Sequence, residues 1–256
     1  MKVFRKLASQ VGFQRLLAFL GLLVLWQIGA MVFAIPIFPQ ALDVLPLFVQ
    51  KAPVLLEHTA FTLGRILIAL LISAFLAVPL GISLALFKSL NRFFDPLISL
   101  IYPIPKIVFL PIFYMLLGIT EWSKILLLSL VLFFQIMVVV RDSALTISEE
   151  LILSVRSLGA GRLALLRFIY LPASVPALLT SLRVSIGTAV AVLFIAEQSL
   201  TQKGLGYYIV VYSYQSLNYK EMYAGIMCVS LIGFVLYSVI SYFEKKLLSY
   251  QSTRTS

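Results

Sequence analysis

The chain has 256 residues, of which 61% are hydrophobic and 12% are charged, and its mean hydropathy is +1.05. A soluble domain carries about 25% charged residues, so this composition excludes an ordinary water-soluble fold and indicates an integral membrane protein. The net charge of +10 could point to nucleic acid. Lysine and arginine in membrane proteins gather in cytoplasmic loops, however, so we expect no nucleic-acid partner.

The first apolar run, 16–35, follows a short basic N-terminus. Basic residues before an apolar run are also typical of a signal peptide, and Val32-Phe33-Ala34 fits a cleavage site. The run is nevertheless long enough to cross a bilayer, and further apolar runs follow it. We therefore predict that it is a retained first transmembrane helix.

A helix that crosses about 30 Å of hydrocarbon needs about 20 apolar residues. Six segments approach or exceed this length: 16–35, 61–87, 94–118, 124–140, 173–197 and 222–243. Pro103, Pro105 and Pro111 interrupt the third segment, so we expect a kink or break at membrane depth. The prediction is an all-α polytopic membrane protein with six transmembrane helices.

We divide the chain into three parts on this basis. Residues 1–57 hold the N-terminal segment, the first helix and an outer loop, residues 58–242 form the transmembrane domain, and residues 243–256 are a cytoplasmic tail.

Positive charge predicts the orientation of these helices. With the N-terminus inside, thirteen basic residues fall in inner segments: Lys2, Arg5, Lys6, Arg15, Lys88, Arg92, Arg141, Arg156, Arg162, Arg167, Lys245, Lys246 and Arg254. Four fall in outer loops: Lys51, Lys124, Lys203 and Lys220. The positive-inside rule then places both termini and the loop 141–172 in the cytoplasm, as in a bacterial inner-membrane protein.

Neither a metal site nor a cofactor is expected. Cys228 is the single cysteine and His58 the single histidine, so no internal disulfide and no Cys/His cluster can form. We interpret both residues as structural.

The cytoplasmic loop 141–172 contains helical periodicity of its own. Apolar residues recur every three or four positions on either side of Gly159 and Gly161: Leu151, Ile152, Val155, Leu158, Leu163, Leu166 and Ile169. This pattern predicts an amphipathic helix, a glycine bend and a second short helix that runs into Pro172. Such a basic amphipathic element can lie on anionic lipid, cap the helix bundle or dock into another protein.

Ionisable residues inside spans usually face protein or water. Arg183 and Glu197 are fourteen residues apart in the fifth span, which places them within about 40° of one face and about 21 Å apart along the axis. We expect both to face a translocation pathway together with the broken segment at Pro103 and Pro105. A structural tether for Arg183 and a bond from Glu197 to the following loop are the alternatives.

Other basic and aromatic residues are less specific. Arg65 is expected to snorkel outward, and Lys106 follows the broken segment. Basic groups along a pathway would favour an anionic solute. The tyrosines of the outer loop 198–221 fit either an interfacial aromatic belt or a protein-docking face.

Five stretches of the sequence resemble one family. They are Arg156-Ser157-Leu158-Gly159-Ala160 with Leu171-Pro172, "YPIPKIVFLPIFYMLLGI" (102–119), "HTAFTLGRIL" (58–67), "SLRVSIGTAVAVLFIAEQ" (181–198) and "GLGYYIV" (204–210). In this order they are similar to permeases of binding-protein-dependent ABC importers, in the nitrate/sulfonate/taurine/bicarbonate branch.

The resemblance implies a type I ABC importer permease with a cytoplasmic coupling helix. Two permease copies would form a pore, separate ATPase subunits would dock on the coupling loops, and an external solute-binding protein would deliver solute. The implied coupling residues are Ser154, Val155, Arg156, Ser157, Leu158, Gly159, Ala160 and Gly161, with Pro172 as a hinge. The family's Glu-Ala-Ala positions hold Leu153, Ser154 and Val155 here, so the acidic residue is absent.

The chain has no Gly-x-x-x-x-Gly-Lys-Ser/Thr loop, so in an importer ATP must be hydrolysed by another subunit.

Two other function classes are less consistent with the sequence. A stand-alone secondary transporter would need several intramembrane acids for ion coupling, and an intramembrane enzyme would need a nucleophile–base pair or metal cluster.

Overall fold

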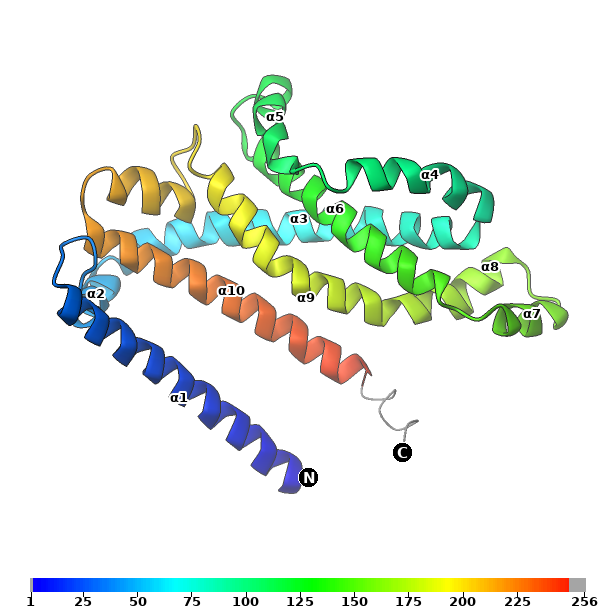
Figure 1. Ribbon diagram of the computed structural model, residues 1–256, viewed down its shortest axis with the longest axis horizontal. Coiled ribbons are helices and arrows are strands. Elements are labelled where there is room, and N and C mark those ends of the chain that lie inside the picture. The colour runs from blue at the N-terminus through cyan, green and yellow to red at the C-terminus, as the bar shows by residue number, and fades with distance from the viewer. Residues whose placement is uncertain (1, 249–256) are drawn as a thin grey trace.

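The computed structural model describes residues 2–248, and helices make up almost all of this part of the chain (Figure 1). The helices, with 3₁₀ and π segments marked η, are α1 (Lys2–Phe33), α2 (Ala41–Gln50), α3 (Ala52–Leu86), α4 (Lys88–Ile101), η1 (Lys106–Phe109), α5 (Leu110–Leu117), α6 (Glu121–Leu145), α7 (Glu149–Ser157), α8 (Arg162–Leu165), η2 (Leu166–Tyr170), α9 (Leu171–Ala196), η3 (Tyr207–Tyr214) and α10 (Tyr219–Leu248). The all-α fold is confirmed, and residues 2–248 contain no strand.

Four helical rods are long and apolar enough to cross a membrane: α3, α6, the continuous helix Arg162–Ala196, and α10. The pair α4 and η1–α5 forms a fifth, broken span, bent by 84°. The described apolar part of α1, Leu17–Phe33, is shorter, and its helix ends two residues before the predicted boundary. Each of the six predicted segments thus overlaps a helix.

α6 is the centre of the subunit. It packs against α3 on one side and α9 on the other, while α10 packs against α9. The buried core between these helices is aliphatic, with Ile66, Leu128, Leu132 and Ile136 among its members. Large apolar side chains also cover the outside of the bundle, as expected for a surface that faces lipid.

The two ends of the bundle carry different elements. In Figure 1, α7 and α8 project at one end, beside the connection from α3 to α4. The opposite end carries α2, η3 and the connection from α9 to α10. By the predicted orientation, we call these the inner end and the outer end.

The course of the chain at Pro172 differs from the prediction. The fifth span does not start at Pro172, because one helix runs from Arg162 to Ala196 through this residue. The π segment η2 lies directly before it. A wider helical turn accommodates a proline, which lacks the N–H that a regular turn would use.

Candidate functional site

The loop at the inner end folds as the sequence predicts. Ser148 caps α7 by accepting a hydrogen bond from the Leu151 amide at 3.4 Å. α7 buries none of its residues in the subunit. Lys88 forms an exposed ion pair with Glu149 at 2.6 Å, and this hydrogen-bonded ammonium lowers the pKa of the Glu149 carboxyl. Together, the cap and the ion pair fix where α7 begins.

α7 ends in a Schellman motif. The Gly159 amide donates to the Arg156 carbonyl at 2.9 Å, and the Ala160 amide donates to the Val155 carbonyl at 3.4 Å. Gly159 has a φ of +86°, a conformation that residues with a Cβ adopt only at a cost. Gly161 has an ordinary φ of −76° and is the N-cap of α8. The two glycines therefore differ: Gly159 makes the turn, and Gly161 follows it.

The surface of this loop presents large apolar side chains among polar ones. Leu151, Leu153, Leu158 and Leu163 are all exposed. Leu153 occupies the position at which the family pattern has its glutamate, so the surface is apolar where that pattern is acidic. Arg156 lies on the same exposed helix, and the Arg162 guanidinium stacks on the Phe87 ring at 5.5 Å.

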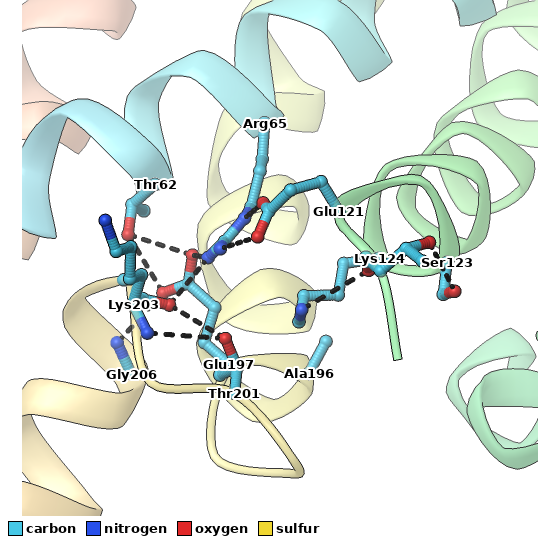
Figure 2. A network of polar contacts seen from close by, with 12 residues as sticks. Thr62, Arg65, Glu121, Ser123, Lys124, Ala196, Glu197, Thr201, Lys203 and Gly206 are labelled. Atoms are coloured by element: carbon cyan, nitrogen blue, oxygen red, sulfur yellow. Dashed lines mark hydrogen bonds and ion pairs between the residues drawn. The ribbon is translucent and has the colours of Figure 1, made fainter. Parts of the chain in front are cut away.

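A second polar centre lies at the outer end, where sequence reasoning did not expect one (Figure 2). Arg65 of α3 binds Glu197, at the C-terminal end of α9, at 2.5 Å. The same guanidinium binds both carboxylate oxygens of Glu121, the first residue of α6, at 2.5 and 2.9 Å. Its side chain is 2% exposed, that of Glu197 is 0% exposed and that of Glu121 is 47% exposed. Arg65 therefore does not snorkel outward, and it ties three helices together.

Glu197 is fully satisfied inside the subunit. Its carboxylate accepts from the Thr62 hydroxyl at 2.9 Å and from the Gly206 amide at 2.9 Å, in addition to Arg65. This placement corrects the expectation that Glu197 faces a pathway. It agrees with the alternative that Glu197 binds the loop after α9.

Arg183 does not join Glu197. It pairs with Glu244 of α10 at 3.1 Å, and Thr180 also donates to Glu244 at 2.8 Å. The Arg183 side chain is 31% exposed. It thus tethers α9 to α10 while part of it remains accessible.

Two lysines lie inside the subunit, and one of them lies differently from the prediction. Lys124, placed in an outer loop, lies in the first turn of α6 and is buried. Lys106 is buried beneath the broken span, where its ammonium donates to the carbonyls of Ile101, Tyr102 and Ile104 at 3.2, 2.6 and 3.2 Å. Pro103 and Pro105 lie on the exposed side of that break.

The tyrosines of the outer loop divide into buried and exposed groups. Tyr208 is buried, stacks on Tyr212 and donates to Glu221 at 3.1 Å. Burial raises the pKa of the Tyr208 phenol, and the neighbouring Glu221 carboxylate adds to this effect. Tyr212 and Tyr214 are exposed. No group of three potential ligands for a metal ion occurs among the described residues.

Comparison with known proteins identifies the family. The family described as "Binding-protein-dependent transport system inner membrane component" matches residues 77–249. The chain belongs to this family. The permease is thus a multi-pass inner-membrane component of an ABC importer, as its resemblance implies.

Relatives and solved structures agree with this assignment. The permease is 33% identical over 180 residues to the taurine transport system permease protein TauC of Escherichia coli, an alignment that covers 70% of this chain and 65% of TauC. It is 27% identical to the formylaminopyrimidine transport permease protein ThiX of Halalkalibacterium halodurans, with 92% and 94% covered. A chain from an inward-facing structure of the MetNI methionine ABC transporter matches its fold with a TM-score of 0.66 and 18% identity, covering 77% of this chain and 98% of that chain.

Proposed function

We propose that this permease and a second permease copy form the pore of an ABC importer for a small solute. A separate ATPase subunit hydrolyses ATP, and an extracytoplasmic solute-binding protein delivers the solute. The family description and the relatives' names support this proposal. Taurine or another sulfonate, nitrate, or a vitamin precursor such as a formylaminopyrimidine is the proposed class of solute. Residues 58–242 are the proposed transmembrane domain.

The observation that carries the coupling mechanism is the exposed face of α7 at the inner end. Ile152 and Val155 pack against the core of the subunit, while the other residues of α7 are exposed. A Schellman turn at Gly159 fixes the direction in which the chain returns to α8. An ATPase groove that received this loop would bury Leu153 and Leu158, and each fully buried leucine contributes about 1.5–3 kcal/mol. Residues Ser154 to Gly161 are the proposed contact, which in this chain is mainly apolar.

We further propose a pathway beside the broken span. Pro103 and Pro105 are exposed at the break, and irregular backbone at membrane depth is tolerated where it lines a cavity or lies within protein. Arg183 is the other candidate, because part of its side chain stays accessible beside Glu244. Pro172 lies within the helix that would carry motion from the docked loop, and the π segment before it is the proposed site of flexing.

Gly159→Val and Gly161→Val form a matched test of the docking role. A valine at Gly159 would meet no neighbouring atom, but holding a valine at the positive φ of this position destabilises the turn by about 1–2 kcal/mol. A valine at Gly161 also meets no neighbour and has an ordinary φ. We expect Gly159→Val to reduce co-purification of the ATPase at least about tenfold, and Gly161→Val to retain it.

Both variants must insert into the membrane at the level of the wild type, which a membrane-fraction blot checks. If the loop instead lies on lipid, the two valines should behave alike, whereas removing charge at Arg156 and Arg162 should release it. Each such charge contributes about 1 kcal/mol near an anionic leaflet. Full ATPase retention by Gly159→Val would refute the docking role.

A further inference from the structure

Residues 201–216, which we call the outer lid, cover the outer end of the subunit. They connect α9 to α10 and contain the π helix η3, drawn in gold opposite α7 in Figure 1. Leu205, Tyr208 and Ile209 are the buried anchors of the lid. Ile209 also lines an open groove of about 560 Å³ between α9 and α10, with Phe194 and Ile226 on its walls. The lid therefore contributes one residue to the wall of this groove.

Both ends of the lid are conformationally strained. Leu200 has a φ of +53° and Leu217 a φ of +58°, values that β-carbon-bearing residues other than asparagine and aspartate rarely adopt. Neither is a glycine, and both side chains are exposed. Such conformations persist only where surrounding contacts hold them, and they occur at segments that switch. Strain at both boundaries marks residues 201–216 as one unit.

Besides its apolar anchors, the lid is held by polar contacts to α3 and Glu197. The Leu205 amide donates to the Thr62 hydroxyl at 2.8 Å, and the Gly206 amide donates to Glu197 at 2.9 Å. Arg65 donates to the Lys203 carbonyl at 3.0 Å. Three backbone groups between Lys203 and Gly206 are thus bound by side chains that also bind one another.

Glycine allows this close approach. Gly204 has a φ of +112°, and a Cβ there would collide with Glu197 and Arg65. A Cβ on Gly206 would collide with the Phe194 carbonyl. The lid backbone therefore lies directly on the ion pair. If the lid lifts, water can replace the partners in these hydrogen bonds, so breaking them costs little net free energy.

We propose that the outer lid opens and closes in each transport cycle, with Arg65, Glu197 and Thr62 as its latch. This inference rests on the proposed importer function, since it requires a cycle driven by a bound ATPase. Opening exposes Leu205 and removes Ile209 from the wall of the α9–α10 groove, at the outer end of the subunit. Closing restores the backbone contacts to Thr62 and Glu197.

Thiol labelling of the assembled permease–ATPase complex tests the lid directly. In a Cys228→Ala background, Leu205→Cys places a thiol at a lid position that is 0% exposed. Val44→Cys places one on α2, at the same end and also 0% exposed, but outside the lid. A charged maleimide should label the Leu205→Cys protein at least about tenfold faster during ATP turnover than with ADP, and the Val44→Cys protein equally slowly in both.

Thr62→Val tests the latch without changing side-chain size. It removes the acceptor of the Leu205 amide and one donor to Glu197. With ADP, the Leu205→Cys protein should then label several-fold faster than its parent. Equal labelling of the Leu205→Cys protein with ATP and ADP, in a complex that hydrolyses ATP, would overturn the proposal. A permease that binds no ATPase would instead refute the proposed importer function.

Discussion

At the scale of single residues, Arg65 holds two carboxylates in different environments. Glu197 is inside the protein and Glu121 is half exposed. A buried ion pair contributes little net stability, because both charges lose their hydration. Removing one partner is costly, however, since the other charge is left buried and unpaired. We therefore expect Arg65 to be structurally important at the outer end.

Arg65→Met should lower the free energy of unfolding in detergent by about 3–5 kcal/mol, because Glu197 loses its counter-charge. Arg65→Met combined with Glu197→Gln should recover at least half of this loss. Arg183→Met is the control, since Arg183 is partly exposed and its partner Glu244 keeps a hydrogen bond from Thr180. Denaturant unfolding followed by near-UV circular dichroism measures all three.

Equal losses for Arg65→Met and Arg183→Met would contradict the structural role of Arg65. So would a double variant that is less stable than the single one.

Sequence reasoning could locate Glu197 but not its partner. Helical spacing puts Glu197 near the face of Arg183, yet spacing does not say what packs against that face. The residues that bind Arg65 lie 56 and 132 positions away in the chain. Gly159 is the opposite case: its bend is encoded by local chemistry, so the sequence predicted it correctly.

At the scale of elements, the broken span depends on an internal cation. The last carbonyls of α4 have no helical partner, and at membrane depth no water is available to bind them. The Lys106 ammonium fills this role for Ile101, Tyr102 and Ile104. It also lies over the rings of Tyr102 and Phe134, at 5.3 and 5.0 Å. Lys106 thus stabilises the break from its buried side.

Lys106→Met should lower the free energy of unfolding by about 1–3 kcal/mol, because buried carbonyls would lose their donor. Lys106→Arg, which keeps a charged donor, should cost less. Unchanged stability of Lys106→Met would mean that the break holds without the lysine.

The prolines predicted this break correctly, because α4 ends directly before the segment that holds Pro103 and Pro105. Pro172 was predicted less well. A proline close to a helix start is compatible with a boundary or with a widened turn, and only the packing of Ile169 and Tyr170 into the core selects the continuous helix here. Local sequence therefore indicates where a helix is perturbed, but not whether it ends.

At the scale of the whole molecule, basic residues predict which end lies in the cytoplasm. Ser157→Cys at the inner end and Leu217→Cys at the outer end place exposed thiols on opposite sides. In intact cells that produce the permease with Cys228→Ala, a maleimide that cannot cross the membrane should label the Leu217→Cys protein from outside. The Ser157→Cys protein should react only in inverted vesicles. Reversed labelling would invert the proposed topology and place α7 out of reach of any ATPase.

The continuous helix Arg162–Ala196 joins these two ends directly. Its 35 residues span about 52 Å, so it reaches from the Gly159 turn to the residue before Glu197. Beyond the π segment, α9 (Leu171–Ala196) has 26 residues and spans about 39 Å, so a rotation of about 5° at that segment would displace the outer end by about 3 Å. That displacement is as large as the 2.5–2.9 Å length of the hydrogen bonds to Glu197. A small swing imposed at the inner end is therefore large enough, geometrically, to unseat a carboxylate on the far side of the bilayer, with no chemical messenger between them.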